Sequence, residues 1–331
     1  MNVSVIVPVG NKAPFINNCV TNLLNQTMKS LEIIFVDAGS TDMSPYMIDR
    51  WAAQYPDRIK AVHCDPQRGI GGAINEGIRT AQGKYIGFAR CEDEFDRMMY
   101  DKLFAAARGD VDMVECGLFD EAAGTRCGGI KRLDTGILDD EKKSEIVVSM
   151  SGAENKLYRK NAFWNEEGFV YMREGSAFVS DDFNLEILLK SKSCGTVREV
   201  LYNRRISMIS DADVYMPQKQ FEDAAALCAA LSNVWETCGV AEGLNVNELE
   251  SVRNFEDLRE AVEAVIIKAY LNAIMICIKH RQNRGFMLNM NIETLKMMRN
   301  EYASSWRRNG YIDRILSEED KRTLDWFDTI S

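Results

Sequence analysis

The first third of the chain alternates short apolar runs with longer segments in which apolar residues recur at helical spacing. The apolar runs, each of a length suited to a buried strand, are residues 3–9, 31–37, 59–63, 84–89 and 111–115. The segments with helical spacing are residues 14–26, 44–54, 72–81 and 96–107. Strands that alternate with helices in this way predict right-handed βαβ units and a largely parallel sheet.

The pattern becomes less regular after this alternating region. Residues 116–150 are rich in glycine and mixed in polarity, so we predict a loop or hairpin that inserts over the sheet edge. Order then resumes with a structured segment at 153–159, a helix at 181–191 and a strand at 196–203. These elements extend the α/β pattern to about residue 215.

The remainder of the chain is helical in pattern. Apolar residues recur at helical spacing over residues 217–238, 255–281, 292–309 and 317–330. We therefore predict two parts, an α/β domain over residues 1–215 and a helical region over residues 216–331. The long apolar stretch at 262–278 is interrupted by Glu263, Lys268 and Asn272, which favours a buried helix over a membrane span.

Polar and acidic residues follow the predicted strands. Pro8 lies at the end of the first strand, Asp37 closes the second, and Glu92 and Asp93 follow the fourth. The carboxyl ends of parallel strands meet at one edge of a sheet, and open α/β sheets bind their ligands there. The sequence therefore predicts a ligand site at this edge.

Composition narrows the class of protein. The net charge of −10 argues against broad nucleic-acid binding, which requires a basic face. Nine cysteines without a CxxC pair, together with only two histidines, argue against a zinc cluster. Scattered cysteines in core segments are typical of reduced thiols in a cytosolic protein. The N-terminus has no basic region followed by an apolar stretch, so we expect no signal peptide and a cytoplasmic location.

Several segments, in order along the chain, resemble the inverting glycosyltransferases of family 2, which have the GT-A fold. Residues 3–11 resemble the family's VSVIVPVYN opening, with Gly10 in place of tyrosine. The other matching segments are 25–27 (NQT), 36–42 (VDAGSTD), 75–78 (NEGI), 155–159 (NKLYR), 183–189 (FNLEILL) and Leu201-Tyr202 with Arg205. The resemblance covers residues 1 to about 210. It implies a GT-A nucleotide-sugar-binding fold, with a Rossmann-like, mostly parallel sheet, and a helical tail is usual for such enzymes.

The resemblance also implies where a donor would bind. The expected nucleotide-sugar-binding residues are Pro8, Val9, Asp37, Gly39, Arg90, Cys91, Glu92 and Asp93. Among the departures from the family pattern, Ala38 stands in place of the second turn aspartate and Ile74 in place of a frequent arginine. For Asp37 the alternative to a nucleoside contact is a carboxylate that stabilises its own turn.

The family's metal-binding DxD motif aligns with Arg90-Cys91-Glu92, so its first carboxylate has become a cation. Our expectation is that Glu92 ligates Mn²⁺ or Mg²⁺, since these cations prefer oxygen ligands. A second interpretation is metal-independent, with the Arg90 guanidinium holding the donor diphosphate. In a third, Arg90 pairs with Glu92, Asp93 or Glu94 and binds nothing.

The catalytic base is expected at the start of the helix that begins near residue 181. The family's ED pair, whose aspartate is the base, aligns with Val179-Ser180, and Asp181 and Asp182 follow directly. We expect one of these two aspartates to accept the proton of the acceptor hydroxyl. The alternative is that Ser180 caps the helix while both acids complement the helix dipole.

Four other residues near the predicted edge carry less weight. Glu174 is a further candidate base on the preceding loop. Arg204 and Arg205 could reach donor phosphates or form a solvated surface pair. His63 ends a predicted strand, but lone histidines are more often structural, so we leave it outside the expected site.

Two hypotheses of function follow. The first is a glycosyltransferase that moves a sugar from a nucleotide-sugar donor, with a UDP-sugar as default, to a glycan, lipid-linked or protein acceptor by inverting displacement. Such an enzyme would serve polysaccharide biosynthesis. The second is a catalytically inactive pseudo-glycosyltransferase that acts as a binding or partner module.

Basic pairs such as Arg307-Arg308 could support peripheral association with the inner face of a membrane. The helical tail could bind a protein partner or a second copy of the chain.

Overall fold

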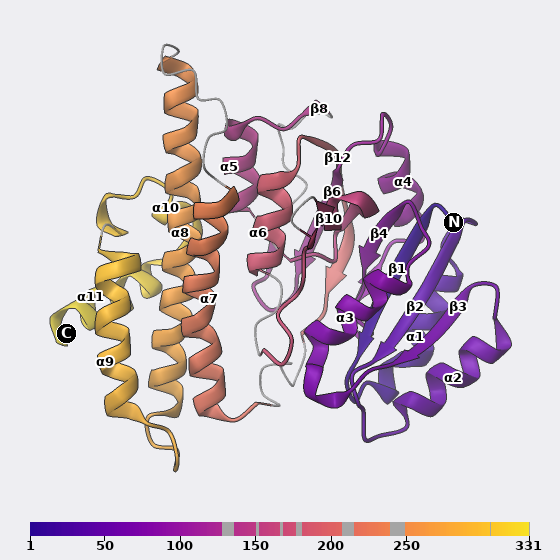
Figure 1. Cartoon of the computed structure of the whole chain (residues 1–331), viewed down its shortest axis with the longest axis horizontal. Coiled ribbons are helices and arrows are strands. Elements are labelled where there is room, and N and C mark those ends of the chain that lie inside the picture. The colour runs from indigo at the N-terminus through magenta and orange to yellow at the C-terminus, as the bar shows by residue number, and fades with distance from the viewer. Residues whose placement is uncertain are drawn as a thin grey trace. The chain divides into compact units, whose positions relative to one another are not determined.

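The computed structural model describes residues 1–127, 136–149, 152–165, 168–176, 181–206, 215–238, 249–304 and 306–330 (Figure 1). The chain divides into two compact units. The first unit combines residues 1–138 with 150–208, and the second combines residues 139–149 with 209–331. All of the residues expected at the site fall in the numbering of the first unit.

The first unit is built on one mixed sheet. Its strands are β1 (Val3–Val9), β2 (Leu31–Asp37), β3 (Ile59–His63), β4 (Tyr85–Phe88), β5 (Glu94–Phe95), β6 (Met113–Asp120), β7 (Thr125–Cys127), β8 (Gly136–Ile137), β9 (Lys156–Arg159) and β12 (Ser193–Arg204). The strand order is β3-β2-β1-β4-β9-β6-β12-β5, with β7 beside β6 and β8 beside β12. A separate hairpin joins β10 (Trp164–Asn165) to β11 (Gly168–Phe169).

The four N-terminal strands form the parallel half of the sheet. β1 pairs in parallel with β2 on one side and with β4 on the other, and β3 lies outside β2. The strand order therefore reverses between β1 and β4. In open α/β sheets the ligand crevice lies outside the carboxyl ends of the strands at such a reversal. The antiparallel strand β9 then joins this half to β6.

Helices cover both faces of the sheet. They are α1 (Ala13–Leu24), α2 (Ser44–Gln54), α3 (Gly69–Thr80), α4 (Met99–Ala106) and α6 (Asp181–Lys190). Alternate residues of β1, beginning with Val3, pack with the buried faces of α1 and α4 in one apolar cluster. On the opposite face a Cβ at Gly77 of α3 would meet Ile6 of β1, and the Phe183 ring of α6 lies 6.2 Å from Phe88 of β4. The alternation of strands and helices in residues 1–115 is therefore as the sequence predicts, although the complete sheet is mixed.

The second unit is helical. Its helices are α5 (Asp140–Val148), α7 (Pro217–Cys238), α8 (Leu249–His280), α9 (Leu288–Met298), α10 (Ile312–Ile315) and α11 (Glu318–Ile330). Within α8, residues Phe255–His280 are long and apolar enough to cross a membrane by length and composition alone. About two thirds of the most apolar stretch is buried inside the structure, as in the core helices of many soluble proteins.

One segment differs from the sequence prediction. Residues 116–150 were expected to form a loop or hairpin, and β7 does pair antiparallel with the end of β6. The later part of this segment, however, forms helix α5, which packs against α8. Asp139 caps α5 by accepting a hydrogen bond from the Lys142 amide at 2.9 Å. Residues 128–135, including Lys131 and Arg132, lie outside the described part of the chain.

Candidate functional site

The candidate site lies at the carboxyl ends of β1 and β4, where the strand order reverses. The β1 loop turns at Asn11, whose positive φ of 55° is tolerated better by asparagine than by most residues. Its side-chain oxygen accepts hydrogen bonds from the Thr41 and Asp42 amides at 2.8 and 3.3 Å. This ties the loop after β1 to the loop after β2 and fixes the position of Lys12 next in sequence.

Glu92 is contacted by two cations at this edge. Its Oε1 atom lies 2.5 Å from Arg90 Nη2 and 3.0 Å from Lys12 Nζ. Its other oxygen, Oε2, is buried and has no hydrogen-bond partner among the described residues. Burial alone would raise the pKa of Glu92, but the positive charges of Arg90 and Lys12 outweigh burial and lower it. The carboxylate is therefore held ionised between two positive charges.

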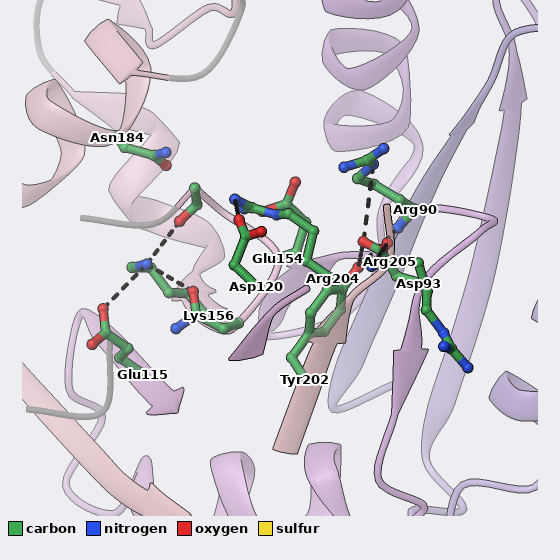
Figure 2. A network of polar contacts seen from close by, with 12 residues as sticks. Arg90, Asp93, Glu115, Asp120, Glu154, Lys156, Asn184, Tyr202, Arg204 and Arg205 are labelled. Carbon is green, nitrogen blue, oxygen red and sulfur yellow. Dashed lines mark hydrogen bonds and ion pairs between the residues drawn. The ribbon is translucent and has the colours of Figure 1, made fainter. Parts of the chain in front are cut away.

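Asp93, next in sequence, is buried and has further contacts of its own. Its Oδ2 accepts a hydrogen bond from the Tyr202 hydroxyl at 2.7 Å, and its Oδ1 accepts one from the Arg205 amide at 3.0 Å. Arg90 Nε lies 3.9 Å from the same carboxylate (Figure 2). Burial raises the pKa of Asp93 to about 6 despite the opposing charge of Arg90. The Tyr202 hydroxyl also accepts the Arg90 amide at 3.2 Å, so Asp93 and Tyr202 hold the turn in place.

Arg204, the last residue of β12, and Arg205, which follows it, both form ion pairs within the protein. Arg204 lies between Asp120, at 3.3 Å, and Glu154, at 3.0 Å (Figure 2). Arg205 contacts Glu94 at 2.5 Å and Glu121 at 2.7 Å. Each of these two arginines therefore has two carboxylates as partners.

Asp37 at the end of β2 is buried and has partners on both oxygens. Oδ1 accepts the Ser40 amide at 3.0 Å, which closes the turn after the strand. Oδ2 lies 3.6 Å from His63 Nδ1, and His63 Nε2 lies 3.0 Å from Asp49. Burial alone would lower the pKa of His63, but the hydrogen bond and charge of Asp49, and then those of Asp37, raise it. A turn-stabilising role for Asp37 is thus present in the structure alongside any role toward a nucleoside.

The other four residues expected to bind the nucleotide-sugar donor are Pro8, Val9, Gly39 and Cys91. The side chains of Val9 and Cys91 are buried, and the Val9 carbonyl accepts the Ala38 amide at 2.8 Å. The pKa of the Cys91 thiol is raised, mainly by a hydrogen bond with Cys19 and secondly by burial. Gly39 has φ of 87°, and any Cβ there would overlap with Pro66. Pro8 is half-buried and pairs with Val36 across the strands.

The two candidate bases have different surroundings. Asp181 is exposed, whereas Asp182 is 8% exposed and its Oδ2 lies 2.7 Å from Arg173 Nε. The Oδ1 atom of Asp182 is buried and has no hydrogen-bond partner within the described ranges. Burial raises the pKa of Asp182, and the Arg173 charge only partly offsets this. Val179 and Ser180, which align with the family's ED pair, lie outside the described residues, as does the proposed capping role of Ser180.

The loop that carries Arg173 and Glu174 is clamped onto the start of α3. Asn75 donates to the Met172 carbonyl at 2.9 Å and accepts the Met172 amide at 2.8 Å. Glu174 accepts two hydrogen bonds from Arg68, at 2.7 and 2.9 Å. Asn75, in the segment that resembles the family's NxGI motif, therefore has a structural role. Glu174, a minor candidate base, is occupied by this pair.

A series of contacts links Asp182 to the end of β1. Arg173 pairs with Asp182, and the Arg173 carbonyl approaches Gly71 so closely that a Cβ there would overlap with it. The neighbouring Ile70 side chain lies 3.4 Å from the position of a Cβ on Gly10. Glycine at position 10, where the resembling family has tyrosine, leaves room for this packing. The candidate base is thus connected to the strand edge that carries the cations.

Lys156 in the NKLYR segment is buried and fully engaged. Its ammonium contacts Glu115 at 3.1 Å, the Asn155 side chain at 2.9 Å and the Gly152 carbonyl at 2.7 Å (Figure 2). In the same segment the Tyr158 hydroxyl donates to Asn184 of α6 at 2.9 Å. These contacts give the NKLYR segment a structural role, because its polar side chains bind other parts of the protein.

The side chains at the DxD position do not fit a divalent cation in the arrangement seen. Arg90 and Lys12 occupy Oε1 of Glu92, and both Asp93 oxygens accept protein hydrogen bonds. Within the described residues, no three His, Cys, Asp or Glu side chains are grouped so that they could hold a metal ion. A bound divalent ion would also meet two positive charges at a distance where like charges repel strongly.

The sequence pattern did not identify Lys12 or Arg173 as site residues, and it set His63 aside. Lys12 reaches Glu92 across 80 positions of sequence, so no local motif shows the pair. For His63 a signal existed, because β2 and β3 end together and Asp37 pairs in register with His63. Arg173 lies in an irregular loop, for which periodicity gives no information.

Comparison with known proteins agrees with this architecture. Residues 4–165 match the family model described as glycosyl transferase family 2. The putative glycosyltransferase EpsH of Bacillus subtilis is 29% identical over 235 residues, which cover 68% of this chain and 66% of EpsH. The poly(ribitol-phosphate) beta-glucosyltransferase of Bacillus spizizenii is 24% identical over 328 residues, covering 98% of this chain but 47% of that protein. The match to this family covers residues 4–165, just under half of the chain.

Solved structures share the fold. Staphylococcus aureus TarS 1–349, in complex with UDP-GlcNAc, superposes with a TM-score of 0.60 at 15% identity and covers 93% of this chain and 92% of its own. The mannosyltransferase PcManGT of Pyrobaculum calidifontis, in complex with GDP-Man and Mn²⁺, gives a TM-score of 0.53 at 16% identity and covers 95% and 85%. The predicted GT-A fold with a helical C-terminal region is confirmed. The chain spans less than two thirds of the EpsH sequence and about half of the beta-glucosyltransferase.

Proposed function

We propose that this protein is an inverting glycosyltransferase that uses a nucleotide-sugar donor, with a UDP-sugar as the first choice. The observation that carries the proposal is the family match over residues 4–165, which includes the loops after β1, β2 and β4. These loops lie around the reversal of strand order, where an α/β sheet binds its ligand. The similarity of fold to a protein solved with UDP-GlcNAc supports UDP as the nucleotide to try first.

Asp182 is the residue we propose as the general base. It would accept the proton of the acceptor hydroxyl while that oxygen attacks the anomeric carbon and the nucleoside diphosphate departs from the opposite face. Its Oδ1, which has no hydrogen-bond partner among the described residues, would supply a proton acceptor, and Arg173 on Oδ2 holds the carboxylate in place. Asp181, which is exposed, is the alternative base.

The acceptor we propose is a glycan or a polyol-phosphate polymer of a bacterial cell surface. The support is the likeness to the poly(ribitol-phosphate) beta-glucosyltransferase, which extends over nearly the whole of this chain. A cytoplasmic location, at the inner face of the membrane, agrees with the supply of nucleotide sugars there. The inactive pseudo-enzyme remains the rival hypothesis, because Ala38, Ile74, Arg90 and Val179-Ser180 depart from the family pattern.

The test is turnover of a panel of UDP-sugars and GDP-sugars, measured as nucleoside diphosphate release with water or a teichoic-acid polymer as acceptor. We expect release from one donor, and loss of at least about a hundredfold in turnover for Asp182→Asn. Glu186→Gln, one turn further along the same helix and paired with Lys190, is the matched control. Failure of the folded wild-type chain to consume any donor would favour the pseudo-enzyme.

A further inference from the structure

The charges after β1 and β4 are arranged in a way that the family's metal-dependent pattern does not require. Two cations, one from each loop, converge on the same oxygen of Glu92. The strands that position them are neighbours in the sheet, and the reversal of strand order lies between them. The most favourable ligand position in this sheet is therefore flanked by an ammonium and a guanidinium.

We propose that Lys12 and Arg90 together bind the diphosphate of the nucleotide-sugar donor in place of a divalent metal ion, and that Glu92 holds the two cations in position. The inference rests on the proposed function and names how that site handles the charge of its substrate. A guanidinium binds phosphate oxygens bidentately, and lysine acts beside it as a point charge. Together they would neutralise the charge that develops on the departing diphosphate.

Accessibility agrees with this assignment. The Lys12 and Arg90 side chains keep 13% and 24% of their surface exposed, whereas Glu92 keeps only 5%. Solvent, and hence a phosphate group, can reach the two cations more readily than the carboxylate that joins them. Burial would weaken the charge on Arg90, but Asp93, Glu92 and Glu154 raise its pKa, so the guanidinium stays protonated.

Geometry also explains why Glu92 is retained when the first carboxylate of the motif is lost. Two like charges held close together repel each other, and a shared carboxylate offsets that repulsion before the donor arrives. The Arg90 amide is fixed independently through Tyr202, so the arginine does not depend on Glu92 alone for its place. Glu92 is thus a positioning residue for cations, and no step of the reaction passes through a metal bound to it.

The experiment is calorimetric titration of UDP and UMP into the full-length chain, in buffer with EDTA and in buffer with Mn²⁺. We expect UDP to bind equally in both buffers, within about twofold. Arg90→Met and Lys12→Met should each weaken UDP at least roughly tenfold and UMP much less, because the lost contacts are to the second phosphate. The exposed Arg97→Met and Lys29→Met are matched controls that should leave both affinities unchanged.

Glu92→Gln distinguishes the two models. With a cation pair that Glu92 holds in position, the change weakens UDP binding by roughly threefold to tenfold, and by the same factor with EDTA and with Mn²⁺. With a metal on Glu92, the same change abolishes Mn²⁺-dependent binding. Thermal unfolding of each variant shows whether a loss of UDP affinity comes from misfolding. Arg90→Lys, which keeps the charge, is a milder change for the same purpose.

Three results would overturn the inference. Binding of UDP to the wild type only with Mn²⁺, lost in Glu92→Gln, assigns the site to a metal and leaves the proposed glycosyl transfer intact. Metal-independent UDP binding that Arg90→Met and Lys12→Met do not weaken removes the cation pair. Absence of binding by UDP, GDP and their sugars in both buffers contradicts the proposed function itself.

Discussion

Arg173 Nε lies 2.7 Å from Oδ2 of Asp182, so the candidate base is buried against a single guanidinium. Arg173 opposes the effect of burial, which raises the pKa of Asp182. A base must be ionised to accept a proton, so activity should rise with pH through the pKa of this carboxyl.

Removing the guanidinium should move that rise to higher pH. In Arg173→Met the acid limb of the pH–rate profile should shift to higher pH, because the charge that lowers the pKa of Asp182 is lost. The profile of donor turnover for the variant and the wild type measures the shift. A variant that loses activity equally at every pH would show that Arg173 acts only in folding or binding, and not through Asp182.

Asp93 predicts a pH dependence of stability. Its pKa in the folded protein is about 6, above the value in an unfolded chain, because burial disfavours the carboxylate. Between the two pKa values the folded state binds more protons, so the Asp93 contribution to the free energy of unfolding falls as pH rises toward about 6. Chemical denaturation of wild type and Asp93→Asn should be compared at pH 5 and pH 7. The free energy of unfolding of the wild type, relative to that of the variant, should be lower at pH 7 than at pH 5. A difference independent of pH would contradict this.

His63 predicts a loss of stability with rising pH as well, but over a higher pH range than Asp93. Its pKa is raised in the folded state, so the stability that it adds is full below its unfolded pKa and is lost as pH rises through the folded pKa. His63→Gln should therefore destabilise the protein at pH 6 and have little effect at pH 8.5. Because the imidazole is half exposed, the effect at pH 6 should stay below about 1 kcal/mol. Equal denaturation midpoints at pH 6 would count against the Asp37 and Asp49 contacts.

Asn75 predicts a loss of stability that is specific to the clamp on the Arg173 loop. The side chain is fully buried and exchanges two hydrogen bonds with the Met172 backbone. Asn75→Ala leaves these backbone groups without partners and should cost about 2–3 kcal/mol. Denaturant unfolding measures this, with the exposed Asn18→Ala on α1 as the control. A cost below about 0.5 kcal/mol would mean that the loop does not depend on this contact.

The strands of the parallel half could be predicted from sequence because burial on both faces gives continuous apolar runs. The predicted runs 3–9, 31–37 and 59–63 coincide with β1, β2 and β3. Helix α5 was missed because its apolar residues are few, and its packing partner α8 begins about a hundred positions later. The stabilising contact of α5 is tertiary, so the local pattern carries little of it.

The candidate site could be predicted only as a set of strand ends. Glu92, Asp93 and Asp37 lie at the predicted edge, as the alternation of strands and helices requires. Which partner each side chain takes is decided by loops that meet in space. Glu92 is paired with a lysine that follows β1, and Asp182 with an arginine from an irregular loop.

Inverting transfer is tested most directly by proton NMR of the purified chain during incubation with an α-linked UDP-sugar that it turns over. We expect UDP release together with a sugar product, free or attached to an acceptor, that first appears in the β configuration. First appearance of the α anomer would contradict inverting displacement with Asp182 as base. A folded chain that consumes no nucleotide sugar would contradict the assignment of transferase activity altogether.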